Sequence, residues 1–170
     1  MNLAPVVNLQ GSSLTIPDGL PGVFQTIAIM RQLVKQYKIN QDIRQAAVCA
    51  IFMTPEKDQL SEVTAIFDYV RDNIRYVRDI AGVETIATPD KTLLCRVGDC
   101  DDQSVLCAAM FESVGYITRF VVAGYHYTGH LEHVYLQVFA DGSWLDCDPT
   151  EQEPIGYSPP NPVTVYIENI

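Results

Sequence analysis

The chain has little of what typically marks a membrane or secreted protein. None of its apolar runs approaches the length of about 18 residues that a membrane-spanning helix requires. Residues 1–5 contain neither the basic nor the apolar stretch of a secretory signal. The five cysteines are an odd number without framework spacing. We therefore expect a cytoplasmic protein with reduced thiols and no membrane partner, although the sequence leaves a Cys95–Cys147 disulfide open.

Basic residues are scarce, and they are confined to the first part of the chain. The net charge is −10, and no Lys or Arg follows Arg119, whereas seven carboxylates do. Phosphate binding needs clustered Lys and Arg, so we expect no nucleic-acid partner. The acidic part of the chain has two interpretations. One is a solvated surface, and the other is selection for a basic or neutral substrate such as a lysine-containing peptide or a polyamine.

The segment Gly98-Asp99-Cys100-Asp101-Asp102 has the form of a reactive cysteine at a helix start. Apolar residues recur at helical spacing through the amphipathic run 101–114, and a glycine follows. A thiol at a helix N-terminus lies near partial positive charge, which favours its thiolate. Asp99 is expected to cap the helix. Asp101 and Asp102 suit the helix dipole but oppose a thiolate, and the sequence does not decide which effect prevails.

The other cysteines are interpreted as small buried apolar residues, a common role for free thiols. These are Cys49, Cys95, Cys107 and Cys147.

A hairpin downstream supplies the partners for this cysteine. Residues 131–140 alternate in polarity like a strand, an Asp-Gly turn follows, and residues 143–148 return as a second strand. A two-residue turn pairs Tyr135 with Asp148, so His133 is the diagonal neighbour of Asp148, at roughly 7–8 Å between backbones. Asp146 lies on the same face and is the fallback partner.

Cysteine, histidine and aspartate in this order provide a nucleophile, a base and an orienting carboxylate. His133 would take the proton of the Cys100 thiol, while Asp148 fixes the imidazole tautomer. The backbone N–H of Cys100 could donate to an oxyanion. Tyr76 could be a second oxyanion donor, although core packing is the plainer interpretation of this tyrosine. The thiolate would attack an amide or ester carbonyl and form a thioacyl enzyme.

These segments resemble the transglutaminase-like (papain-related) cysteine enzymes. The resemblance covers about residues 60–150, with spacings of 33 and 15 residues between Cys100, His133 and Asp148. It includes an upstream helix at 65–76 with a lead-in at 93–96, the cysteine segment at 98–102, the segment 115–121, the histidine strand at 132–136 and the tryptophan-to-aspartate segment at 144–150. The family's fold is α+β, with the cysteine on a central helix packed against an antiparallel sheet that carries the histidine and the aspartate.

The resemblance implies an enzyme that needs no cofactor. We expect a peptidase or amidase acting on a protein or peptide through a thioacyl intermediate. The first alternative is a transglutaminase or protein-glutamine deamidase, and the second is a catalytically silent binding or structural module of the same fold. No EF-hand loop or paired Cys-x-x-Cys motif occurs, so neither calcium nor zinc is inferred. His126, His130 and His133 fall on a strand and turn, which also argues against a metal site.

The remaining sequence predicts a helical beginning and a short C-terminal strand. Helices are expected near 23–37, at 41–51 and from Thr54 onward, with short strands at 12–16 and 163–167. We expect one compact domain, in which a helical preface (residues 1–56) packs on a catalytic core (residues 57–170). The small size also resembles family members encoded in phage or prophage gene clusters. The sequence leaves the oligomeric state undetermined.

Overall fold

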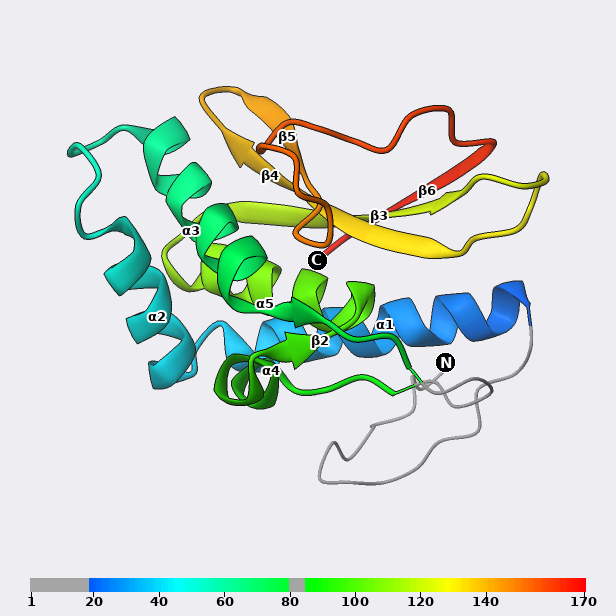
Figure 1. Ribbon diagram of the computed structural model, residues 1–170, viewed down its shortest axis with the longest axis horizontal. Helices are drawn as coiled ribbons and strands as arrows, with labels where there is room; N and C mark the ends of the chain where they lie inside the picture. Colours follow the sequence, from blue (N-terminus) through cyan, green and yellow to red (C-terminus); the bar gives the residue numbers. More distant parts are fainter. Residues whose placement is uncertain (1–18, 80–84) are drawn as a thin grey trace, which may run out of the picture.

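A layer of helices covers one face of a four-stranded antiparallel sheet (Figure 1). The structure is a computed structural model that describes residues 19–79 and 85–170. The strand predicted at 12–16 lies outside the described residues. No helix in the described ranges is both long and apolar enough to cross a membrane.

The helices near the start of the described chain follow the predictions, except at one boundary. Helix α1 spans Leu20–Tyr37 and α2 spans Gln41–Ile51, as expected. Helix α3 spans Gln59–Asn73, so the prediction that it begins near Thr54 is wrong. Its N-cap is Asp58, whose carboxylate accepts hydrogen bonds from Ser61 N–H at 3.0 Å and Ser61 Oγ at 2.7 Å. The segment before Asp58 contains a left-handed residue, Lys57, which interrupts any earlier helix.

Helix α5, Cys100–Ser113, is the centre of the molecule. It contacts the other four helices of the described chain and strands β3 and β4. Almost all of its residues are buried, including the polar side chains of Asp101, Asp102 and Gln103. The amphipathic pattern inferred from the sequence is therefore wrong, because packing on all sides leaves this helix no solvent face.

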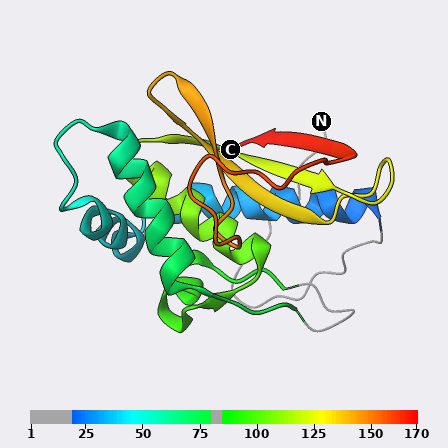
Figure 2. The same cartoon turned by 45° about the horizontal axis from the view of Figure 1, so that its top comes forward.

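The sheet has the strand order β5-β4-β3-β6. Its strands are β3 (Ile117–Gly124), β4 (His133–Ala140), β5 (Ser143–Cys147) and β6 (Thr164–Asn169). The turn between β4 and β5 has positive φ at both central residues, 48° at Asp141 and 78° at Gly142, as a two-residue type I′ turn requires. Ala140 therefore pairs with Ser143 in the predicted register. The predicted C-terminal strand is β6, which forms an edge of the sheet beside β3 (Figure 2).

Alternate residues of β4 point into the helical layer. Val134, Leu136 and Val138 belong to the main core, together with residues of α1, α2, α3 and α5. On the opposite face, Tyr135 packs with Val121 and Ala123 of β3 in a second, smaller cluster. The division into a preface (1–56) and a core (57–170) stays a prediction, although α1 and α2 share the main core with α5.

Two short elements just before α5 differ from the predictions. The expected helix at 65–76 ends at Asn73, and β1 (Arg75–Tyr76) pairs in parallel with β2 (Val97–Gly98). Helix α4 (Pro89–Cys95) was missed apart from its last turn, which falls in the expected lead-in. It ends at Arg96, whose φ of 57° is left-handed.

Two of the four cysteines interpreted as buried are in fact exposed. Cys107 and Cys147 lie in the core, whereas Cys49 and Cys95 are at the surface. Cys95 and Cys147 are both free thiols, so the disulfide that the sequence left open is absent.

Candidate active site

Cys100 is the first residue of α5, and Asp99 alone separates it from the short strand β2. Asp99 caps the helix as predicted, accepting hydrogen bonds from the N–H groups of Asp101 at 3.2 Å and Asp102 at 3.4 Å. Gly98 permits this close approach, since a Cβ there would lie 2.6 Å from Asp102 Cβ. A glycine before the cap thus allows the cysteine loop to fold tightly onto the first turn of α5.

The surroundings of Cys100 favour its neutral thiol. Its Sγ lies 3.5 Å from Asp101 Oδ1, in hydrogen-bonding contact. Burial, followed by the charges of Asp101 and Asp99, raises the pKa of the Cys100 thiol well above its ordinary value, and a backbone hydrogen bond from Val134 lowers it. The sequence left the balance between helix dipole and acids open. Burial and the acids prevail, so the expected resting thiolate is not favoured.

His133 and Asp148 meet where β4 begins and β5 ends. His133 Nε2 lies 2.6 Å from Asp148 Oδ2, so the predicted diagonal contact is present. Asp148 is only 2% exposed. Its other oxygen, Oδ1, accepts hydrogen bonds from Thr150 N–H at 3.1 Å and Thr150 Oγ1 at 2.6 Å. Because Nε2 bonds to Asp148, Nδ1 is the imidazole nitrogen left for a second partner.

Asp146, the fallback partner of His133, has a different neighbour. Its Oδ1 accepts a hydrogen bond from Gln137 Nε2 at 2.8 Å, and Gln137 Oε1 accepts one from Arg119 Nε at 2.6 Å. The Arg119 guanidinium also lies 4.0 Å from the ring centroid of Trp144. Asp146 therefore belongs to a polar row across the sheet, and Asp148 is the carboxylate that contacts His133.

The cysteine and the histidine approach each other through the start of β4. Ser104 Oγ of α5 donates a hydrogen bond at 3.3 Å to the carbonyl oxygen of Val134, the residue directly after His133. Among the described residues, the thiol hydrogen-bonds to the side chain of Asp101 and makes no direct hydrogen bond to His133. The structure thus brings His133 and Asp148 into contact and packs α5, the helix that begins at Cys100, against β4.

Tyr76 lies at the surface, so the core-packing interpretation is wrong. It is 49% exposed, because β1 runs along the outside of the cysteine loop and pairs Tyr76 with Gly98. Partial burial is the main cause that raises the pKa of its hydroxyl. Its pairing with Gly98 places Tyr76 on the strand next to the cysteine loop.

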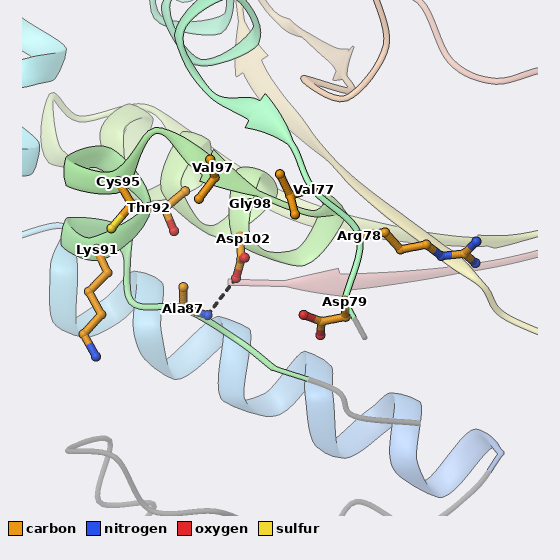
Figure 3. A pocket seen from close by; sticks show the side chains of 10 residues that line it. All are labelled: Val77, Arg78, Asp79, Ala87, Lys91, Thr92, Cys95, Val97, Gly98 and Asp102. Atoms are coloured by element: carbon orange, nitrogen blue, oxygen red, sulfur yellow. Dashed lines mark hydrogen bonds between the residues drawn. The ribbon is translucent and has the colours of Figure 1, made fainter. Parts of the chain in front are cut away.

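A cavity of about 380 Å³ lies beside the cysteine loop, between β2, α4 and residues 77–79, which follow β1 (Figure 3). The Asp102 carboxylate points into it and accepts a hydrogen bond from Ala87 N–H at 2.7 Å. Lys91 and Arg78 contribute basic side chains to its lining. The sequence analysis missed this cavity because its walls come from α4 and from residues 77–79, which it did not place.

The three histidines considered as metal ligands separate into two groups. His133 is engaged by Asp148, whereas His126 and His130 in the β3–β4 loop both contact Glu132. The three-histidine combination therefore does not form. A different cluster in the described chain, His126, His130 and Glu132, brings metal-ligating atoms within 4.8 Å of one another.

The cysteine lies at the start of a central helix, and the adjacent sheet carries the histidine that contacts the aspartate. This is the arrangement that the sequence resemblance implies. Residues 46–149 match the Transglutaminase-like superfamily, which covers more than half of the chain. The chain belongs to this superfamily. A comparison with curated proteins finds no match.

Solved structures with the same fold come from several bacteria. A protein from Cytophaga hutchinsonii, assigned provisionally as a cysteine protease, matches with a TM-score of 0.57 and 15% identity over 88% of this chain and 50% of its own. Legionella pneumophila LapG matches with a TM-score of 0.55 and 16% identity over 82% of this chain and 87% of its own.

A third structure, from Parabacteroides distasonis and assigned provisionally as a protease, has a TM-score of 0.55 and 16% identity over 76% of this chain and 27% of its own. This chain thus spans half the length of the Cytophaga protein and about a quarter of the Parabacteroides protein. At these identities the likeness establishes the fold.

Proposed function

We propose that the protein is a cysteine-dependent amide hydrolase, a peptidase or amidase, with Cys100 as nucleophile, His133 as base and Asp148 as orienting carboxylate. The observation that carries this proposal is the 2.6 Å contact between His133 Nε2 and Asp148 Oδ2. A buried carboxylate that is itself held by Thr150 fixes one imidazole tautomer, with the proton on Nε2 and the basic lone pair on Nδ1.

The raised pKa of Cys100 favours a particular order of proton transfers. The resting thiol is neutral, and His133 Nδ1 accepts its proton as the sulfur attacks the substrate carbonyl. The N–H of Cys100 donates to the developing oxyanion, and the Tyr76 hydroxyl is a second donor. When the tetrahedral intermediate collapses, imidazolium returns the proton to the leaving amine. Water then adds to the thioester, and hydrolysis releases the acid and the free thiol.

A protein or peptide is the proposed substrate. Support comes from the structural relatives assigned provisionally as proteases and from the exposed setting of Tyr76 beside Cys100. The chain after Asp148 adds exposed carboxylates at Glu151 and Glu153 and no basic side chain. Such a surface favours a basic or neutral segment of the substrate over an acidic one.

Two other activities share the same site and are separated by experiment. A transglutaminase would resolve the thioacyl enzyme with an amine, and a deamidase would resolve it with water after attacking a glutamine side chain. A catalytically silent module is favoured by one observation, the raised pKa of a thiol that donates to Asp101. That module would form no acyl enzyme at all.

The test is to trap the thioacyl enzyme. The protein is incubated with an activated N-acyl amino-acid ester, quenched in acid and mapped by mass spectrometry. We expect one acyl group on Cys100, absent from Cys100→Ser and retained in Cys95→Ser, a matched change at an exposed thiol. Release of free acid in the presence of a labelled primary amine indicates hydrolysis, and amide formation indicates transfer. Acylation at another thiol, or none, contradicts the proposal.

A further inference from the structure

Two imidazoles and a carboxylate converge in the loop between β3 and β4, outside the proposed triad. His126 Nδ1 lies 2.7 Å from Glu132 Oε1 and 2.9 Å from Oε2. His130 Nδ1 lies 3.1 Å from Glu132 Oε2. These ligand atoms all lie within 4.8 Å of one another. Imidazole nitrogen and carboxylate oxygen are both ordinary ligands of zinc.

One of these nitrogens is not satisfied by the contact that it makes. His130 Nδ1 is shielded from solvent and has no hydrogen bond of acceptable direction, although Glu132 Oε2 is close enough. A buried polar atom without a partner costs free energy. An ion between His130, His126 and Glu132 would give this nitrogen the partner that it lacks.

The loop holds these residues in place through its backbone. Gly124 allows the two ends of the loop to pack closely, since a Cβ at this position would lie 1.5 Å from the His130 carbonyl oxygen. Glu132 N–H donates to Ala123 O at 3.0 Å, and Tyr125 N–H donates to Glu132 Oε1 at 3.0 Å. The three side chains therefore come from a closed loop of fixed geometry, as a preorganised metal site requires.

We propose that this loop binds one Zn²⁺ through Nδ1 of His126, Nδ1 of His130 and the carboxylate of Glu132. Tetrahedral zinc with bonds of about 2.0–2.1 Å places neighbouring ligand atoms roughly 3.3 Å apart. The separations of 2.7 Å from His126 Nδ1 to Glu132 and 3.1 Å from His130 Nδ1 to Glu132 need only a small opening, and the ligand atoms of all three residues lie within 4.8 Å of one another. Two nitrogen ligands favour zinc over calcium or magnesium, which prefer oxygen.

Zinc in this loop would connect its two ends. His126 follows β3 closely, and Glu132 immediately precedes His133, so the ion would fix the approach to β4. The His126 side chain is 74% exposed, which leaves a path for the ion to enter. With three protein ligands, the fourth position belongs to water. We expect bound zinc to raise the thermal unfolding temperature of the protein.

Zinc titration of a thiol-depleted protein tests this site independently of catalysis. The background carries Cys49→Ser, Cys95→Ser and Cys100→Ser, because exposed or partly exposed thiols bind zinc themselves. Isothermal titration with ZnCl₂ at pH 7.5 should show one saturable ion per chain. Adding either His126→Ala or His130→Ala should weaken the affinity by at least about tenfold.

The matched control is His133→Ala, which removes the same side chain from the adjacent strand and should change zinc affinity less than twofold. Zinc should also raise Tm in the background protein and not in its His126→Ala variant. Absence of saturable binding, or affinity lost with His133→Ala and kept with His126→Ala and His130→Ala, overturns the proposal. Neither result bears on the proposed hydrolase, because the nucleophile is already replaced.

Discussion

The Asp101 carboxylate should lower the reactivity of the Cys100 thiol, and removing the charge of Asp101 should increase that reactivity. Asp101 Oδ1 lies 3.5 Å from Cys100 Sγ, and both this carboxylate and the thiol are largely buried. Asp101→Asn keeps the shape of the side chain and removes the charge that opposes a thiolate. We therefore expect the pKa of Cys100 to fall in this variant, and the thiol to be alkylated faster at a fixed neutral pH.

The size of the effect follows from Coulomb's law. Two unit charges about 4 Å apart interact by about 1 kcal/mol in water and about 4 kcal/mol near a protein surface. That range enlarges the thiolate fraction by about 5-fold to 10³-fold. A less basic thiolate is a weaker nucleophile, with a Brønsted coefficient of about 0.4–0.5. The net expectation is an alkylation rate that rises by roughly 3- to 40-fold.

The assay is iodoacetamide labelling of Cys100 at pH 7, followed by site-resolved mass spectrometry. The matched control is Asp42→Asn, which removes an exposed first-turn carboxylate from a different helix, α2. This control should leave the labelling rate of Cys100 unchanged. A rate in Asp101→Asn that is equal to or below that of the unmodified protein would refute the electrostatic account of this thiol.

Three further changes test other parts of the account. Thr150→Val removes the hydroxyl that donates to Asp148, so kcat/KM on a peptide substrate should fall about 3- to 10-fold. Thr150→Ser keeps a hydroxyl and should restore kcat/KM. An unchanged kcat/KM in Thr150→Val would mean that Asp148 needs no such support. Gly98→Ala places a Cβ 2.6 Å from Asp102 Cβ and should lower the free energy of unfolding in urea by about 1–3 kcal/mol. A decrease below about 0.5 kcal/mol would show that the cysteine loop can shift to accommodate the added methyl group. Burial raises the pKa of the Cys107 thiol, so this thiol ionises at lower pH in the unfolded chain than in the folded one. The free energy of unfolding should therefore decline as pH rises above about 8.5, and it should decline less in Cys107→Ala. A free energy of unfolding that stays constant from about pH 7 to 10 would contradict this.

The sequence predicted those elements whose local signals agree with their tertiary setting. The β4–β5 hairpin combines alternation with an Asp-Gly turn, and the register of Ala140 with Ser143 follows from these two signals. The start of α3 was misplaced because a proline near Thr54 imitates a helix start, whereas the cap is Asp58. Helix α5 looked amphipathic because its apolar residues recur at helical spacing. Only tertiary packing reveals that the polar residues between them, such as Asp101 and Asp102, are buried as well.

The contact between residues of the candidate site was predictable from the sequence, whereas the protonation preference of its thiol was not. The contact of His133 with Asp148 follows from strand register alone. The protonation preference of Cys100 does not, because it depends on the depth of burial and on a distance to Asp101 that spacing does not give. The convergence of His126, His130 and Glu132 could not be predicted either, since it depends on the close packing of the His130 backbone against Gly124.

The most direct test of the central claim is the dependence of Cys100 acylation on His133 and Asp148. A peptide-based electrophile is reacted with the protein at pH 7, and labelling of Cys100 is followed over time. Labelling should be lost in His133→Ala and reduced at least about tenfold in Asp148→Asn. It should stay unchanged in Asp146→Asn, whose carboxylate binds Gln137 instead. Labelling of Cys100 that is equally fast in all four proteins would contradict the assignment of a working cysteine, histidine and aspartate triad.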